Sequence, residues 1–274
     1  MDFGGEGVTD KEQQSSEDIF YEAHLRNRSN DILGKAWQIT NLLSNQTAFD
    51  YFRYGVMIRF KLIMESRNLL FELISKKDGN RIDTTLENIY LNSMYINMIA
   101  TFDNVAWAFQ YEYDLIDGAN ENNNLKRQIG IYNKEFIMKL KIKDKELYTN
   151  LKVYKDWYET LKTFRDPATH RMPLYCPPIT ISKEKDLDEH KKLNEKFSQM
   201  NYNDNPQQYM ELLNEVHNIG TFQPIFIVSS EKEKSVYDLR KITNDDYKIF
   251  LAVMDIFLMW IEKHELKHRT QVNT

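Results

Sequence analysis

Residues 47–76, TAFDYFRYGVMIRFKLIMESRNLLFELISK, decide the fold class of this chain. Apolar side chains recur in this stretch at steps of three, four or seven residues, which places them along one face of an α-helix. The run KKDGNR at 76–81 follows, and Gly79 is the expected stop of the helix. The apolar face consists of Phe49, Phe52, Val56, Phe60, Ile63, Leu70 and Ile74. A helix of this length predicts a mainly α-helical protein.

The rest of the chain extends this pattern. Gly (9 residues) and Pro (6 residues) are scarce, which suits long helices with few tight turns. Thr243, followed by Asn-Asp-Asp, is the expected N-cap of the last helix. Further helices are expected at 17–43, 83–117, 132–141, 144–165, 184–199, 206–218 and 244–268. We predict an up-and-down helical bundle made of residues 17–172 and 243–268, after a polar, disordered tail at 1–16.

Residues 173–242 interrupt this pattern and read as a small mixed α/β insertion before the last helix. Pro173, Pro177 and Pro178 prevent the preceding helix from continuing. The segments 179–182 (ITIS) and 222–229 (FQPIFIVS) are rich in β-forming residues. We expect them to form a short hairpin or ribbon beside the two helices of the insertion.

Composition limits the functional classes. A net charge of −5 argues against a sequence-blind nucleic-acid binder, although a local basic cleft remains compatible with it. Cys176 is the only cysteine, so no intramolecular disulfide can form and a reducing compartment, the cytoplasm, is expected. No apolar stretch is long enough to cross a membrane, and no secretion signal is recognisable.

The strongest candidate site is Arg165-Asp166-Pro167-Ala168-Thr169-His170. Leu151, Tyr154, Tyr158 and Leu161 lead up to it along an apolar seam, and Arg165 takes the next position. Asp166 and Pro167 suit the start of a new short helix, whose N-terminus could join Arg165 and His170 around one anion. The simpler interpretation is an arginine that pairs with Asp103 or Asp166, beside a surface histidine.

The motif RDPATH at the end of a helical bundle resembles the HEPN superfamily. Active members are metal-independent endoribonucleases that dimerise so that two such motifs face each other. The resemblance implies proton transfer by His170, phosphate binding by Arg165 and a supporting role for Asp166. It also implies an RNA substrate, a homodimer, no cofactor and a role as a toxin or in defence. Inactive relatives serve as RNA- or protein-binding modules, which is the alternative hypothesis.

Two positions depart from the family pattern. HEPN toxins that pair with a nucleotidyltransferase antitoxin usually carry a tyrosine two residues after the histidine, and here that residue is Met172. The pairing with such an antitoxin is therefore not supported. Pro173 also ends the helix early, whereas family members usually continue it.

A remote alternative is a zinc hydrolase. His264-Glu265-Leu266-Lys267-His268 matches the HExxH pattern, which needs both histidines on one helical face, a glutamate base and a third ligand. The residues that follow, RTQVNT, contain no such ligand. A solvated last helical turn is the preferred interpretation.

Asp103 lies on the apolar face of the helix expected at 83–117. It is expected either to pair with a buried arginine such as Arg67, or to orient His170 or Arg165. The four tryptophans lie among apolar helix residues and are expected in the core rather than as platforms for base stacking: Trp37, Trp107, Trp157 and Trp260.

Overall fold

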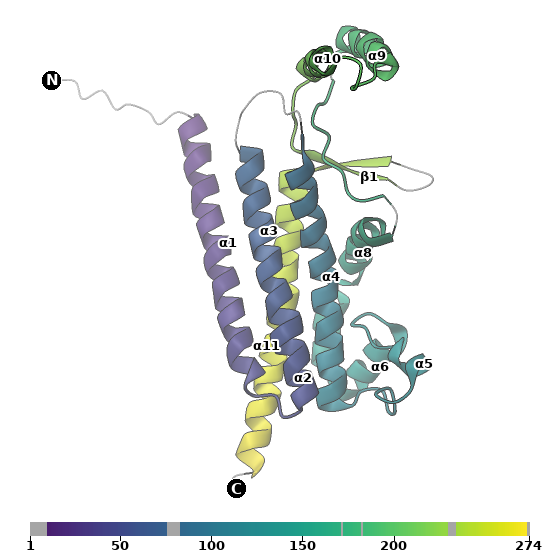
Figure 1. Cartoon of the computed structure of the whole chain (residues 1–274). Helices are drawn as coiled ribbons and strands as arrows, with labels where there is room; N and C mark the ends of the chain where they lie inside the picture. Colours follow the sequence, from purple (N-terminus) through teal and green to yellow (C-terminus); the bar gives the residue numbers. More distant parts are fainter. Residues whose placement is uncertain (1–9, 76–82, 171, 182, 230–233, 273–274) are drawn as a thin grey trace, which may run out of the picture. The chain divides into compact units, whose positions relative to one another are not determined.

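The chain is predominantly α-helical in a computed structural model that describes residues 10–75, 83–170, 172–181, 183–229 and 234–272. Within these ranges, 10–20, 167–170, 217 and 266–272 are described by their backbone alone. Long helices make up most of the described chain, and a two-stranded sheet accompanies them (Figure 1). The predicted fold class, mainly α with a small β element, is confirmed.

Contacts divide the chain into two compact units, which we describe separately. The first unit contains the chain up to Phe60, then Thr101–Lys155, and the chain from Tyr247 onwards. The second contains Lys61–Ala100 and Asp156–Asp246. No helix in the described part of the chain combines the length and apolar character needed to cross a membrane.

The first unit is built from helices and short connections. It holds α1 (Asp10–Thr40), α2 (Gln46–Asp50), the π-helix η1 (Tyr51–Val56), the start of α3 (Met57–Ser75), the second half of α4 (Thr85–Tyr113), α5 (Asn123–Lys126), α6 (Lys134–Lys143), α7 (Lys145–Lys152) and most of α11 (Leu239–Val272). Helix α1 begins at Asp10, so residues 10–16 are helical and not part of a tail. Residues 1–9 of the predicted tail lie outside the described residues.

Aromatic packing forms the core of this unit. Phe109 of α4 contacts Phe257 and Trp260 of α11 at ring-centroid distances of 5.3 and 5.2 Å. Phe250 of α11 contacts Phe60 and Phe102, both at 5.4 Å. Of these six side chains, Trp260 is 6% exposed and the five phenylalanines are each 1% exposed or less. Burial of this much apolar area is the main force that holds the helices together.

The second unit contains the remaining parts of α3, α4 and α11 together with α8 (Lys155–His170), α9 (Glu184–Gln199) and α10 (Pro206–Asn218). Its strands β1 (Ile225–Ser229) and β2 (Lys234–Asp238) form an antiparallel hairpin, with Phe226 opposite Tyr237 (Figure 1). The helices predicted at 184–199 and 206–218 are confirmed. Of the strand predicted at 179–182, residues 179–181 form only an isolated bridge from Thr180 to Thr221, and residue 182 lies outside the described residues.

Several predicted boundaries were wrong. The helix expected at 144–165 is divided into α7 and α8 at Val153 and Tyr154. The last helix begins at Leu239, so Thr243 is an internal, buried residue and not an N-cap. Its hydroxyl donates to the Leu239 carbonyl oxygen at 2.5 Å, as a hydroxyl inside a helix often does.

Two large apolar side chains are exposed, and one of them, Trp37, was expected in the core. Ile89 of α4 is 53% exposed, because the buried face of this helix runs instead through residues such as Leu91, Tyr95 and Phe102. Trp37 of α1 is 49% exposed, whereas Trp260 is buried as predicted. Helical periodicity fixes the spacing of a face but leaves its orientation ambiguous where apolar residues surround most of the helix, as they do on α4.

Candidate functional site

Helix α8 carries the RDPATH motif in its last two turns and runs without interruption from Lys155 to His170. The predicted start of a new helix at Asp166 and Pro167 was therefore wrong. Phe164 is 2% exposed and Leu161 is 1% exposed, so packing favours continuation of the helix and outweighs the local cost of a proline. It follows that the motif has no helix N-terminus of its own whose N–H groups could bind an anion.

Arg165 is held by the carboxylate next to it. Its Nε lies 2.9 Å from Oδ1 of Asp166, and the two side chains are 27% and 56% exposed. The simpler interpretation of the sequence, a pair between Arg165 and Asp166, is thus present in the structure. The arginine also remains in contact with solvent, which a phosphate-binding residue requires.

The His170 side chain lies outside the described residues, but its backbone completes α8. His170 follows Arg165 by five positions of α-helix, which corresponds to about 7.5 Å along the axis and about 140° around it. The Cα atoms of the two residues therefore lie on different sides of α8.

Two asparagines of α4 hold the chain that follows the motif. The Asn92 side chain donates to the Leu174 carbonyl at 2.9 Å and accepts from the Leu174 N–H at 3.0 Å. One turn earlier, Asn88 Oδ1 accepts from the Cys176 N–H at 2.6 Å. These contacts satisfy backbone groups of a segment that belongs to no helix or strand, and so they fix the exit from α8.

Further contacts extend this anchor. Thr84 Oγ1 donates to the Cys176 carbonyl at 2.6 Å, and Tyr175 forms a backbone bridge with Ile227 of β1. Sequence reasoning missed Asn88 and Asn92. The available signal was a pair of amides spaced four residues apart on a largely apolar helix, since such spacing places both on one face.

A buried carboxylate was also missed. Asp246 is 8% exposed and accepts hydrogen bonds from Tyr95 Oη and Trp157 Nε1, both at 2.8 Å. Burial raises the pKa of Asp246 to about 6, although the two hydrogen bonds act in the opposite direction. Asp246 precedes the buried Phe250 by four residues and therefore falls in the apolar seam of α11, which is the signal that could have identified it.

Asp103 is half-buried on α4. Arg67 is 3% exposed, its guanidinium contacts the side-chain oxygen of Asn244, and its Cζ lies 4.5 Å from the centroid of the Phe71 ring. These contacts belong to Arg67 and do not bear on Asp103. The two expected roles of Asp103, pairing with Arg67 or orienting Arg165 and His170, stay predictions.

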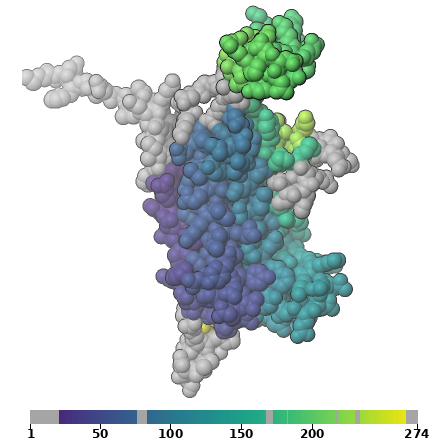
Figure 2. All heavy atoms as spheres, in the orientation of Figure 1, coloured from purple at the N-terminus to yellow at the C-terminus, as the bar shows by residue number. Residues whose placement is uncertain are grey.

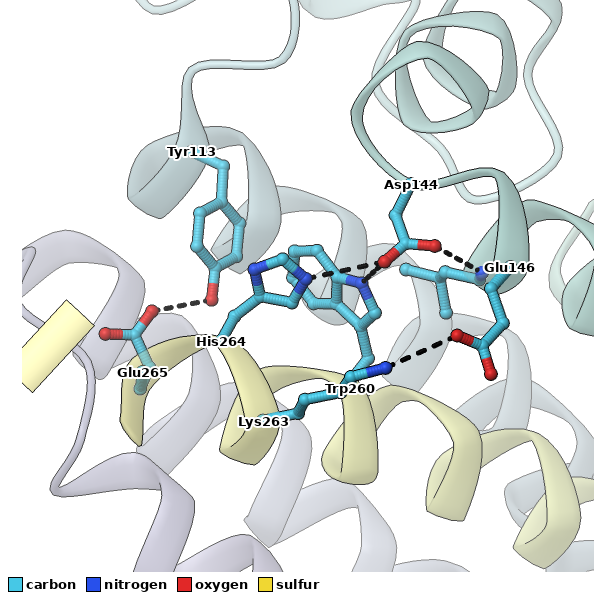
Figure 3. Close-up of polar contacts among 8 residues, drawn as sticks. Tyr113, Asp144, Glu146, Trp260, Lys263, His264 and Glu265 are labelled. Carbon is cyan, nitrogen blue, oxygen red and sulfur yellow. Dashed lines mark hydrogen bonds and ion pairs between the residues drawn. The ribbon is translucent and has the colours of Figure 1, made fainter. Parts of the chain in front are cut away.

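The HExxH pattern lies in a polar cluster of the first unit (Figure 3). Asp144 caps the start of α7 by accepting from the Leu147 N–H at 2.9 Å, and it also accepts from Trp260 Nε1 at 2.8 Å. His264 Nε2 lies 3.4 Å from the same carboxylate, and its ring is tilted by 34° against that of Trp260, with centroids 4.0 Å apart. Burial raises the pKa of Asp144, but these hydrogen bonds outweigh burial and hold it below the ordinary value.

Glu265, the next residue of α11, is 7% exposed (Figure 3). It accepts a hydrogen bond from Tyr113 Oη at 2.8 Å, and burial together with this carboxylate raises the pKa of Tyr113. The preferred interpretation of a solvated last turn was therefore wrong for Glu265. Side chains of the pattern attach α11 to α4 and α7 instead.

The described residues hold no group of three or more His, Cys, Asp or Glu side chains that could bind a metal ion. His268 itself lies outside the described side chains. Glu265, which would be the base of a zinc hydrolase, is buried and accepts a hydrogen bond from Tyr113. The zinc hypothesis therefore rests on the spacing of His264 and His268 in the sequence.

Comparison of the chain with models of known protein families, with curated proteins and with solved structures found no match in any of the three. The resemblance to the HEPN superfamily thus stands on the RDPATH motif and on the helical character of the chain.

Proposed function

We propose that this chain is a HEPN-type endoribonuclease that cleaves RNA without a metal ion and uses Arg165 and His170 from two copies of the chain. The observation that supports this most is the position of Arg165, partly exposed near the end of α8 and 2.9 Å from Asp166. Arginine is always charged, and its planar guanidinium suits phosphate oxygens. Beyond the motif, the chain is anchored at Leu174 by Asn92 and at Cys176 by Asn88.

The continuous helix favours a homodimer. Because the Cα atoms of Arg165 and His170 lie about 140° apart around α8, we propose that one phosphate is bound by the arginine of one copy and the histidine of the other. Two copies of α8 that face each other supply two arginines and two histidines to a shared site. Two histidines suit this reaction, because it requires one base and one acid.

The reaction is a transesterification within the RNA strand. One His170 accepts the proton of the 2′-hydroxyl as its oxygen bonds to the adjacent phosphorus. The bond from phosphorus to the 5′-oxygen breaks, and the second His170, in its protonated form, donates a proton to the leaving oxygen. Arg165 stabilises the negative charge that develops on the phosphoryl oxygens. The products are a 2′,3′-cyclic phosphate and a 5′-hydroxyl.

The Arg165–Asp166 pair also favours a second candidate, a non-catalytic HEPN-like module that binds RNA or a protein. A carboxylate 2.9 Å from the guanidinium partly neutralises it and competes with a phosphate. In this case Arg165 would stabilise the end of α8 and contribute nothing to a reaction.

Cleavage of several structured and unstructured RNAs in EDTA separates the two candidates. For an active enzyme we expect cyclic-phosphate ends, a loss of about 10²- to 10⁴-fold for His170→Ala and about 10²- to 10³-fold for Arg165→Ala. Lys162→Ala is the matched control, because Lys162 is a cation of the same helix paired with Glu159. Absence of cleavage by the folded wild-type protein, with RNA binding retained, would favour the non-catalytic module.

A further inference from the structure

Arg53 of η1 lies among three aromatic rings on the first unit. Its Cζ is 5.0 Å from the ring centroid of Trp37, 5.6 Å from that of Phe49 and 5.8 Å from that of Tyr54. Such distances are typical of cation–π contacts, which hold a guanidinium in place without cancelling its charge. In the described part of the chain, Arg53 forms no ion pair with a carboxylate.

The rings around Arg53 are unusually accessible. Trp37 is 49% exposed and Tyr54 is 60% exposed, although large aromatic side chains are normally well buried. Figure 2 shows the purple atoms of α1 beside the indigo atoms of α2 and η1 on one face of the molecule. The surface formed by Trp37, Arg53 and Tyr54, here called the aromatic–arginine surface, combines flat apolar area with an uncompensated positive charge.

Several contacts keep this surface rigid. Glu112 accepts hydrogen bonds from the Ser44 N–H at 2.8 Å and from the Asn45 N–H at 2.9 Å, which fixes the turn between α1 and α2. Tyr51 of η1 stacks on Trp107 of α4, with centroids 5.7 Å apart and planes 10° apart. The segment η1 is therefore attached to α4 on one side while Arg53 contacts α1 on the other.

The π-helical form of η1 adds an independent indication. π-Helical turns are rare, cost stability and occur frequently at functional sites. Gly55 allows this turn to lie close to α4, since a Cβ at that position would lie 2.7 Å from Cγ of Asn104. The chain thus maintains an uncommon backbone geometry at the residues that present Arg53 and Tyr54.

We propose that the aromatic–arginine surface binds single-stranded RNA, with a base stacked on an exposed ring and a phosphate beside Arg53. A nucleotide unit combines a flat aromatic base with an anion, and these are the two features that this surface complements. Each stacked base contributes enough to be measured by substitution, and every base has a stacking face, so the contact tolerates different sequences. The inference names the binding surface for the substrate class of the proposed function and rests on that proposal only for the choice of RNA.

The test measures binding of a short, unstructured, fluorescently labelled RNA by anisotropy at several salt concentrations. All variants are made in the His170→Ala background, so that the strand stays intact whether or not the wild-type protein cleaves it. Trp37→Ala and Arg53→Gln should each weaken binding roughly 5- to 100-fold. Ile58→Ala is the matched control, since Ile58 is an equally exposed apolar residue (49%) outside the cluster, and it should bind as the parent does.

The salt dependence distinguishes a phosphate contact from a structural role. Loss of one phosphate contact should make the slope of log K against log salt concentration about 0.7 less steep for Arg53→Gln, whereas Trp37→Ala should leave the slope unchanged. Thermal unfolding midpoints close to that of the parent would show that each variant is folded. A variant that unfolds is replaced by Arg53→Lys or Trp37→Phe, which keep the charge or a ring and should bind more tightly than the full truncations.

Equal RNA affinity for folded Arg53→Gln, Trp37→Ala and the parent would overturn the proposal. So would a parent that binds no RNA but sediments as a dimer whose dissociation is caused by Trp37→Ala, because the surface would then bind a second copy of the chain. Cleavage assays report separately on the proposed function. Binding that depends on Arg53 without any cleavage would sustain this inference alone, and cleavage with no dependence on Arg53 would sustain the proposed function alone.

Discussion

Asn92 and Leu174 exchange two hydrogen bonds: the amide of Asn92 donates to the Leu174 carbonyl at 2.9 Å, and its oxygen accepts from the Leu174 N–H at 3.0 Å. In a sheet, a neighbouring strand would pair with the N–H and carbonyl groups of such a residue. Leu174 belongs to no helix or strand, and the side chain of Asn92 pairs with both groups instead. Leu174 is 1% exposed, so its backbone groups have little access to water as an alternative. Both backbone groups of Leu174 are therefore satisfied by one side chain of α4.

Asn92→Ala should lower the free energy of unfolding by roughly 1–3 kcal/mol, because it leaves a donor and an acceptor of Leu174 without partners. Urea denaturation measures this change. If the proposed function holds, cleavage should fall as well, since the end of α8 loses its anchor. Asn97→Ala is the matched control on the same helix, as the Asn97 side chain donates to the Ser93 carbonyl within α4. Equal effects of the two substitutions would contradict a specific role of Asn92.

Asp246 should make stability depend on pH. Its pKa is raised from 3.8 to about 6, so the folded protein holds the proton more tightly than the unfolded chain does. The stabilisation from the protonated carboxyl is complete below the unfolded pKa and is lost as pH rises through about 6. The loss is on the order of 3 kcal/mol.

Asp246→Asn removes this titration. Compared with the wild type, the variant should gain stability as pH increases from below 4 to above 6. Tyr95→Phe deletes a hydrogen bond that lowers the pKa of Asp246, and it should shift the transition to higher pH. Denaturation curves at several pH values test both variants. Stability profiles of Asp246→Asn and the wild type that stay parallel would contradict the assignment.

Asp144 should contribute to stability and not to catalysis. Asp144→Ala removes the cap of α7 and the acceptor of the Trp260 N–H, a combined cost of roughly 2–4 kcal/mol. Glu146→Ala removes only the exposed ion pair with Lys263 and should cost less than about 1 kcal/mol. EDTA should change neither value. Stabilisation of the wild type by added zinc, abolished by His264→Ala, would instead support a metal site.

The π-helix η1 lies close to α4 where Gly55 meets the side chain of Asn104. In Gly55→Ala the new Cβ would meet the Asn104 side chain at 2.7–3.0 Å, so we expect a loss of about 1–3 kcal/mol. Asn104→Ala in the same chain should recover part of this loss, because it removes the atoms that clash. A double-mutant cycle on unfolding free energies measures the coupling, and strictly additive effects would argue against the contact.

The sequence was sufficient to predict the helices that repeat a clear period. Phe52, Phe60 and Leu70, which were expected on the apolar face, are all buried. The break between α7 and α8 and the continuity of α8 through Pro167 were not predictable from local preferences. Both depend on which side chains find partners in the folded chain, and Phe164 in its aromatic environment is an example.

The candidate site shows the same limit. The motif identified Arg165 and its neighbour Asp166 from spacing alone, and these two residues do form a pair. Asn92 and Asp246 were missed, because their partners, Leu174 and Tyr95, are distant in sequence and no local pattern connects them. Trp37 was expected in the core because its neighbours are apolar, but periodicity does not show that this part of α1 is exposed.

The most direct test of the account is cleavage, in EDTA, of one RNA strand and of the same strand with every 2′-hydroxyl methylated. The proposed reaction begins with attack by that hydroxyl, so we predict that the wild-type protein cleaves only the unmodified strand, leaves a 2′,3′-cyclic phosphate, and loses this activity in His170→Ala. Cleavage of the methylated strand, or unchanged activity in the variant, would contradict the mechanism that assigns proton transfer to His170.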